Sequence, residues 1–199
     1  SESRIGTAHN RGLNTNTCVK CGQCIMVCPT GALTERSNLQ NVIDALHNPR
    51  LFPVIQFSPT VPATIAEDFN IRGTKDVLNL LRAALKKMGF RQVYDVAMAA
   101  DLTLMEEAAE YVARSTAGQV QPFFTSCCPA WTRYIQAFSP QTLPNLSHTA
   151  SPQQIMGRLI KQYITSSASL KPDSVYVVSV MPCTAKKHES ELDRMKDGS

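Results

Sequence analysis

The spacing of the first four cysteines is the strongest constraint on what this chain can fold into. They are separated by two, two and three residues, and Pro29 follows the last: Cys18, Cys21, Cys24 and Cys28. Two-residue spacers let three thiolates of one tight loop reach three corners of a four-iron, four-sulfur cluster, whereas a fourth cysteine before proline normally points at a neighbouring cluster. A zinc site also suits paired cysteines, but three even spacings favour iron.

Bacterial-type ferredoxins use this spacing for their 4Fe-4S clusters. One motif supplies three ligands to one cluster and a single ligand to another, and the sequence contains no second motif. Three explanations remain open. The chain is a fragment whose upstream part held the second motif, another subunit supplies the thiolates, or the cluster is unusual; we favour the first.

Composition excludes several classes of protein. The 199 residues suffice for one main core with a small appendage, and 43% hydrophobic residues with a net charge of +4 are typical of a folded chain rather than a disordered one. No run reaches the roughly 18 apolar residues that a membrane-spanning helix needs. Lys and Arg are scattered, so we expect no nucleic-acid partner.

After Pro49, short apolar segments alternate with amphipathic ones, which is the pattern of an α/β fold. We expect strands at residues 51–58, 92–97, 121–126 and 174–181. We expect helices at residues 40–47, 74–88, 102–115 and 151–167, with Gly89 as a C-terminal cap and Ser151 as an N-cap. The sequence therefore predicts an α/β domain at residues 49–199, with a largely parallel sheet flanked by helices, preceded by a small ferredoxin-like iron-sulfur domain at residues 1–48.

Two more cysteine-bearing segments follow expected strands. Residues 125–131 read TSCCPAW, and residues 181–189 read MPCTAKKHE. Ligands of open α/β sheets gather at the carboxyl ends of the strands, so we expect both segments and the loop after Ser58 to converge on one site. Taken alone, each segment could equally be a buried free thiol or a helix start packed on the core.

Together with the cysteine-rich loop, these segments resemble the iron-iron hydrogenases, whose first two signatures read TSCCPxW and MPCxxKxxE. The resemblance covers nearly the whole chain in the family's order. It implies reversible oxidation of molecular hydrogen at an H-cluster, which is a 4Fe-4S cubane joined to a two-iron subsite bearing carbonyl, cyanide and a dithiolate amine. It makes Cys128 and Cys183 the first two cubane ligands.

The family's third signature, which carries the other two cubane cysteines, is missing from this sequence. The resemblance therefore implies a partner, either the remaining part of the catalytic subunit or a second polypeptide. It also implies electron transfer through the ferredoxin-type clusters, with Cys28 on the cluster nearest the site, to a carrier such as a ferredoxin or a cytochrome.

The resemblance further implies a proton route from Cys127 through Glu107 and Ser147 to Glu110, with Arg114 at its outer end. A thiol suits proton transfer because its reference pKa, about 8.5, lies close to neutral. Glu107, Glu110 and Arg114 also fall on one face of an expected helix. That stripe could equally be an ordinary solvated face, and only the family context favours the route.

Six residues are expected around the two-iron subsite by the same resemblance. Lys186 would donate to one cyanide, and the hydroxyl of Thr60 with the backbone after Pro59 would hold the other. The remaining three are Ser58, Gln153 beside a carbonyl ligand, and Met181 lining the cavity. Glu189 and His188 receive no role, because Glu189 can pair locally with a lysine and His188 fits a surface position.

A second interpretation is a hydrogenase-like iron-sulfur carrier or sensor without the two-iron subsite, similar to the cluster-assembly relatives of the family. We favour the hydrogenase, because a carrier needs neither a proton route nor cyanide donors. We expect a cytoplasmic location, since no secretory signal is recognisable, and a periplasmic one if an export signal lies elsewhere.

Overall fold

The computed structural model describes residues 9, 11–13, 17–118 and 122–192. Within these residues, β1 (Phe52–Phe57), β2 (Gln92–Asp95) and β3 (Val175–Val180) form one parallel sheet in the order β2-β1-β3. In the register, Phe57 lies opposite Asp95 on one edge of β1 and opposite Val180 on the other. All three strands therefore end at the same edge of the sheet, and the predicted parallel α/β fold is confirmed.

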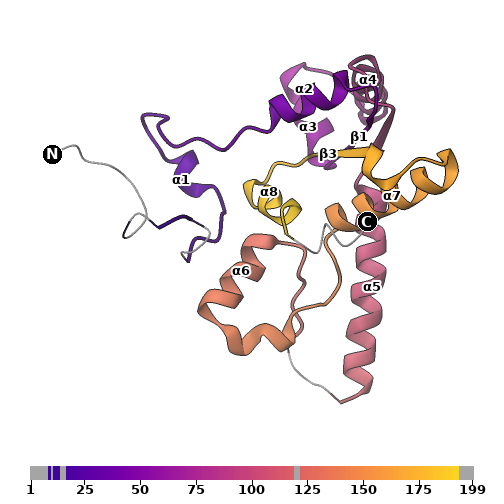
Figure 1. Cartoon of the computed structure of the whole chain (residues 1–199). Coiled ribbons are helices and arrows are strands. Elements are labelled where there is room, and N and C mark those ends of the chain that lie inside the picture. Colours follow the sequence, from indigo (N-terminus) through magenta and orange to yellow (C-terminus); the bar gives the residue numbers. More distant parts are fainter. Residues whose placement is uncertain (1–8, 10, 14–16, 119–121, 193–199) are drawn as a thin grey trace.

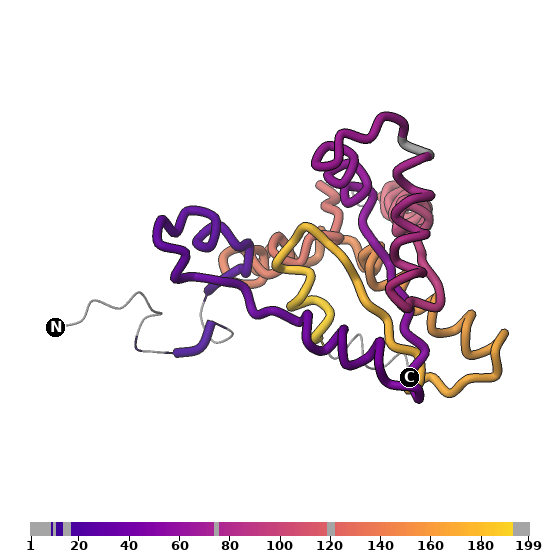
Figure 2. Tube along the Cα trace, turned by 90° about the horizontal axis from the view of Figure 1, so that it is seen from above, coloured from indigo at the N-terminus to yellow at the C-terminus, as the bar shows by residue number. Residues whose placement is uncertain are grey.

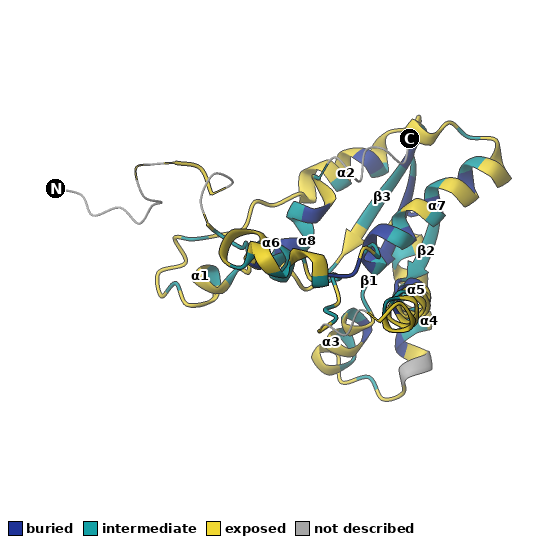
Figure 3. Ribbon diagram, turned by 90° about the horizontal axis from the view of Figure 1, so that it is seen from below, coloured by how far each residue is buried: buried dark blue, intermediate teal, exposed yellow. Residues whose placement is uncertain are grey.

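One buried cluster lies where two of the helices drawn in Figure 1 pack on the sheet. The helices α5 (Ala97–Thr116) and α7 (Pro152–Ala168) pack on each other, and α7 packs on β3. Their buried side chains join those of the strands in one cluster: Val54, Val96, Ala99, Met156, Ile160, Ile164 and Val175. Burying each large aliphatic side chain contributes about 1.5–3 kcal/mol. Figure 3 shows the buried residues gathered around the sheet and α7, whereas α1 is largely exposed.

The helices α2 (Leu39–His47), α3 (Thr60–Asp68) and α4 (Thr74–Lys87) lie near the strands or at their connections. The helix α2 precedes β1, α3 follows it and packs on α4, and α4 contacts β2. The helix α4 ends as predicted at Gly89, whose φ of 113° and whose amide bond to the carbonyl of Lys86 are typical of a glycine cap. Ser151 caps α7 as predicted, because its Oγ accepts the amide of Gln154 at 3.4 Å.

Two predicted elements are wrong in part. Residues 122–126, the described part of the expected third strand, form only an isolated bridge between Phe124 and Leu146. The hydrogen bonds of Phe124 go to Asn145 and Ser147 rather than to β2 or β3, the two edge strands of the sheet. The strand expected at residues 92–97 ends at Asp95, whose carboxylate accepts the amide of Ala97, so α5 begins five residues before the predicted Leu102.

The cysteine-rich loop lies away from the sheet but rests on two helices. It contains the short helix α1 (Gln23–Met26), and its supports are α6 (Pro129–Phe138) and α8 (Thr184–Ser190). Arg133 of α6 donates to the carbonyl of Cys18, and Thr184 of α8 donates to that of Lys20 at 2.9 Å. The chain between α1 and α2 then passes alongside α8, where Lys187 pairs with Glu35 at 3.1 Å (Figure 2).

The 3-10 helices η2 (Pro140–Asn145) and η3 (Pro172–Ser174) connect α6 to the next loop and α7 to β3. None of the helices in the described ranges combines the length and the apolar composition needed to cross a membrane.

Candidate functional site

The loop of the first four cysteines is built on a left-handed glycine. Gly22, at φ 80°, begins α1 and separates the second and third cysteines. The four thiols of this loop are free and at least partly exposed. Hydrogen bonds from the amide of Leu33 and from the hydroxyl and amide of Thr30 lower the pKa of Cys28 from 9.0 to about 7. Cys28 is therefore partly a thiolate at neutral pH, the form that binds iron.

Cys128 and Cys183 are the N-caps of α6 and α8, and these two helices pack against each other. Both thiols are free and exposed. The sulfur of Cys128 accepts the amide of Trp131 at 3.4 Å. In the described part of the chain, no three His, Cys, Asp or Glu side chains lie close enough together to hold a single metal ion.

A buried ion pair joins the two signature segments. Lys186 Nζ donates to the carbonyl of Cys127 at 2.8 Å and pairs with Glu189 Oε2 at 2.9 Å. The same carboxylate oxygen accepts the hydroxyl of Ser151 at 2.9 Å and the amide of Gln153 at 3.4 Å. The Lys186 and Glu189 side chains are only 16% and 6% exposed. Glu189, which the sequence left without a role, thus fixes the position of Lys186.

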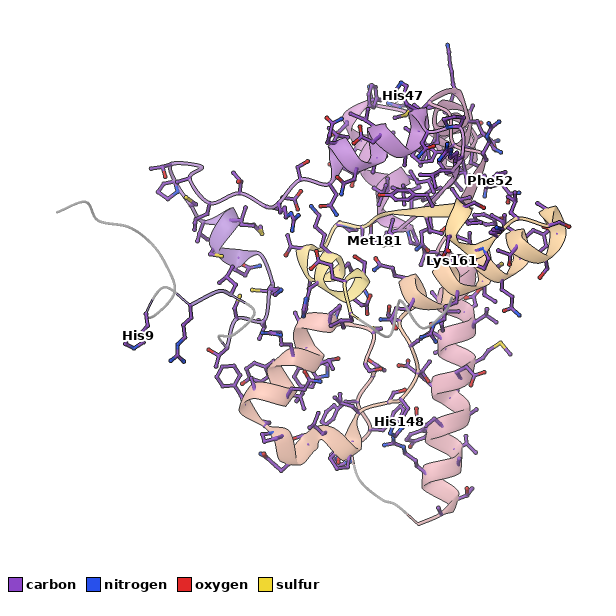
Figure 4. All side chains as sticks on the ribbon, in the orientation of Figure 1. His9, His47, Phe52, His148, Lys161 and Met181 are labelled. Carbon is purple, nitrogen blue, oxygen red and sulfur yellow. The ribbon has the colours of Figure 1, made fainter. Side chains whose placement is uncertain are left out.

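The loops after β1 and β3 lie side by side, because the amide of Ser58 donates to the carbonyl of Val180 at 3.0 Å. The hydroxyls of Ser58 and Thr60 are 2.9 Å apart, and Pro59 is the N-cap of α3. Met181 follows directly at the end of β3 (Figure 4). The three strand-end loops of the sequence prediction therefore come together here, since Lys186 reaches the Cys127 loop.

A cavity of about 320 Å³ opens beside the loop between β3 and α8, and its lining includes Gln153, Met181, Cys183 and Lys186 but no residue of the β1 loop or of the Cys127 segment. Gln153 is buried, and its Oε1 has no hydrogen-bond partner among the described residues. An unpaired buried oxygen costs about 1–3 kcal/mol, which is typical of a functional site rather than of a packed core. The thiol of Cys183 suits a thiolate-bound cluster, and the ammonium group of Lys186 and the amide nitrogen of Gln153 are donors that suit polar ligands on such a cluster.

A chain of hydrogen bonds runs along α5 on the other side of the Cys127 segment. The backbone of Ser147 pairs with Phe124, three residues before Cys127, and Ser147 Oγ donates to Glu110 Oε2 at 2.7 Å. Glu110 in turn pairs with Arg114. The structure thus brings three of the five predicted route residues into direct contact.

Glu107 lies one turn before Glu110 on α5 and is buried at 8% exposure, with its Oε1 unpartnered among the described residues. The described contacts do not join Glu107 or the thiol of Cys127 to this chain directly. Arg114 is held at several points, since it donates to the carbonyls of Pro144 and Leu146 and stacks over Phe123.

The electrostatics of Glu110 are set by opposing causes. Desolvation raises its pKa, but hydrogen bonds from Ser147, His148 and Arg114 outweigh this and lower the pKa from 4.5 to about 2. Glu110 is therefore a stable carboxylate at neutral pH.

Sequence reasoning missed three residues of the site. Arg133 and Thr184 hold the cysteine-rich loop on α6 and α8, and His148 touches Glu110. Their contacts depend on how distant segments dock. His148 and Thr184 had a signal in the sequence, because they directly follow the predicted site residues Ser147 and Cys183.

Comparisons with known families and proteins agree with this geometry. The family described as "Iron only hydrogenase large subunit, C-terminal domain" matches residues 52–199, and the family described as "4Fe-4S binding domain" matches residues 12–34. The chain is 39% identical to the NADP-reducing hydrogenase subunit HndD of Solidesulfovibrio fructosivorans over 191 residues, which cover 93% of this chain and 33% of the relative.

A relative of another kind is similar at nearly the same level. The cytosolic iron-sulfur assembly component 3 of Pongo abelii is 34% identical over 89% of this chain and 40% of the relative. Among solved structures, a variant of apo [FeFe]-hydrogenase HydA1 from Chlamydomonas reinhardtii superposes with a TM-score of 0.72 at 31% identity, over 79% of this chain and 41% of that one. The chain thus spans about a third of the length of the hydrogenase HndD.

Proposed function

Since the chain belongs to the family of iron-only hydrogenase large subunits, we propose that it forms the part of a catalytic subunit that interconverts molecular hydrogen with protons and electrons. The observation that carries this proposal is the hydrogen-bonded chain Ser147–Glu110–Arg114 along α5, with the unpaired buried carboxylate oxygen of Glu107 one turn away. A protein that only stores or passes iron-sulfur clusters has no use for a proton relay.

The chain's own residues divide the work of moving protons. The H-cluster, when bound, would supply the redox chemistry of hydrogen. Cys127 would hold a proton at its sulfur beside that group, Glu107 and Ser147 would pass it, and Glu110 would attract it from solvent. General acid–base groups of this kind typically contribute about 10²–10⁴-fold to a rate.

Cofactor binding falls to the loops at the strand ends. Cys128 and Cys183 would ligate the cubane, and Lys186 would donate to a cyanide, which is a strong acceptor in a cavity that excludes water. Thr60 and the backbone after Pro59 would hold the second cyanide. Ser58, Gln153 and Met181 would complete the lining.

The cysteine-rich loop would carry electrons. Cys18, Cys21, Cys24 and Cys28 would ligate ferredoxin-type clusters, and the contact between Thr184 and Lys20 brings the neighbours of Cys183 and Cys21 together. Electrons would leave for a carrier such as a ferredoxin or a cytochrome. The remaining cubane ligands would come from a polypeptide segment that carries the third signature.

A second candidate function is iron-sulfur cluster carriage, as the name of the assembly-component relative indicates for that protein. That relative is 34% identical to this chain and the hydrogenase is 39% identical, so cluster carriage is tested as a candidate as well. It would use the six cysteine ligands but would leave Cys127, Glu107 and Glu110 without a task.

Substitution of Cys127 separates the two candidates. In the complete, cluster-loaded subunit, we expect Cys127→Ala to keep its iron content while hydrogen evolution falls by about 10²-fold or more, because a methyl group cannot relay a proton. Thr125→Ala, an exposed change in the same loop, is the control and should keep full activity. Unchanged hydrogen evolution in Cys127→Ala would remove the relay role, and no evolution by the loaded parent would favour carriage.

A further inference from the structure

The outer end of the polar chain carries a histidine with no role so far. His148 lies on the loop beside α5 (Figure 4), and its side chain is 85% exposed. Its Nδ1 is 2.8 Å from Glu110 Oε1 and 3.0 Å from Arg114 Nη2. One ring nitrogen therefore faces both a carboxylate and a guanidinium group.

These two contacts are alternatives. A bare Nδ1 can only accept a hydrogen bond, and Arg114 can only donate one. A protonated Nδ1 can only donate, and the ionised Glu110 can only accept. When Nδ1 gains a proton, it therefore loses the hydrogen bond from Arg114 and donates one to Glu110. Both partners already lie within hydrogen-bond distance.

Among Glu110 and the side chains that bond to it, one group can bind and release a proton near neutral pH. Glu110 itself stays ionised, because its hydrogen bonds lower its pKa to about 2 despite desolvation. An arginine does not release its proton in proteins, and a serine hydroxyl does not titrate in this range. An imidazole binds and releases a proton near neutral pH.

The surroundings of His148 contain charges of both signs. Arg114 and Glu110 touch it directly. The other ionisable side chains that line the two cavities bordering His148 are Glu106 on α5, Arg133 on α6, Arg158 on α7, and His188 and Glu189 on α8. Only Glu110 and Arg114 are within hydrogen-bond distance of its Nδ1 among the contacts of the described residues, so they set its bonding.

We propose that His148 exchanges protons between bulk solvent and Glu110, an inference that rests on the proposed function. A buffer acid protonates the exposed ring. The imidazolium then passes its Nδ1 proton to one oxygen of Glu110, and the carboxyl group hands a proton on to Ser147 from its other oxygen, so that Glu110 returns to its ionised form and the ring to its neutral form. The reverse sequence carries protons outward when hydrogen is oxidised. One proton moves in each step and no electrons do. His148 acts through Glu110 and does not touch the reacting atoms.

The kinetic test uses His148→Gln in the complete, cluster-loaded subunit, since glutamine keeps hydrogen bonding but does not titrate. In dilute buffer we expect hydrogen evolution to fall by about tenfold, less than the roughly 10²–10⁴-fold of a direct acid or base. Added imidazole should restore the rate, and His47→Gln, an exposed histidine on α2, should change nothing. A variant as fast as the parent at every buffer concentration, or a slow one that imidazole does not rescue, would overturn the proposal.

A second measurement does not depend on activity, so it separates failure of this proposal from failure of the proposed function. Diethyl pyrocarbonate acylates neutral imidazole, and peptide mass spectrometry gives the rate for each histidine against pH. In Glu110→Gln the midpoint for His148 should move by about half a pH unit or more to lower pH, because the variant lacks the carboxylate that stabilises the imidazolium. The midpoint for His47 should stay fixed. An unmoved His148 midpoint would show that the pair does not share a proton.

Discussion

At Glu110, one carboxylate collects donors from two segments that are far apart in the sequence. Arg114 comes from the same helix, whereas the hydroxyl of Ser147 and the amide of His148, at 3.1 Å, come from the loop before α7. These hydrogen bonds form only in the folded chain and favour the ionised carboxylate. Ionisation of Glu110 therefore stabilises the folded arrangement of that loop.

This coupling predicts a specific acid sensitivity. The pKa of Glu110 is about 2 in the folded chain against an ordinary 4.5, so its ionised form stabilises the fold above about pH 4.5. That contribution is lost as the pH falls from about 4.5 toward 2. In Glu110→Gln, we expect the free energy of unfolding, measured by denaturant titration across this range, to fall less steeply with decreasing pH than in the parent.

Glu106→Gln is the matched control for this measurement, because Glu106 is an exposed glutamate on the same helix. It should keep the steep pH dependence of the parent. If Glu110→Gln and the parent lose stability with the same slope, the hydrogen bonds to Glu110 do not favour its charged form.

At the scale of elements, Gly22 fits the cysteine-rich loop to α8. Its φ is 80°, and a Cβ at this position would lie 2.7 Å from Thr184 Oγ1. Gly31 in the same loop also has a positive φ, 63°, but open space where its Cβ would be. Substitution of either glycine would strain the backbone. Only substitution of Gly22 would also bring a side chain into contact with α8.

We expect Gly22→Ala to destabilise the chain by about 1–3 kcal/mol more than Gly31→Ala, since only the first forces atoms into occupied space. The free energies of unfolding of both variants would give this difference. In a Thr184→Ala background, which removes the crowded oxygen, the two substitutions should cost nearly the same. An equal cost in the parent background would mean that the loop does not seat on α8 in solution.

The sequence predicted those elements whose signals are local. A few neighbouring residues suffice to predict these elements: the apolar segments of β1 and β3, the glycine after α4 and the serine before α7. The strand prediction around Phe124 was wrong because its hydrogen-bond partners, in the segment of Leu146, are set by tertiary packing that the local pattern does not report. The docking roles of Arg133 and Thr184 were invisible for the same reason.

Candidate site residues followed a similar division. Motif spacing identified the cysteines, and the resemblance identified Lys186 and the stripe on α5. Spacing could not reveal that Glu189 holds Lys186 against the Cys127 carbonyl, nor that His148 reaches Glu110, because both depend on the approach of separate loops. The roles of the site residues remain predictions that the variants above test.

At the scale of the whole molecule, the loops after β1 and β3 lie side by side at one edge of the sheet, and Lys186 reaches the Cys127 segment from α8. In the proposed function, the cysteine-rich loop would carry electrons and the polar residues of α5 would carry protons. Family membership and the iron-sulfur motif are established by the matches over residues 52–199 and 12–34. The distinguishing question is whether the cavity beside Lys186 receives a group with carbonyl and cyanide ligands or only a cubane.

Infrared spectroscopy of the complete, reconstituted subunit answers this question most directly, because metal-bound carbonyl and cyanide stretches fall in a window free of protein bands. Our account predicts both sets of bands in the parent, with the cyanide bands displaced in Lys186→Ala as its donor is lost. A fully iron-loaded and reconstituted sample without these bands would contradict it.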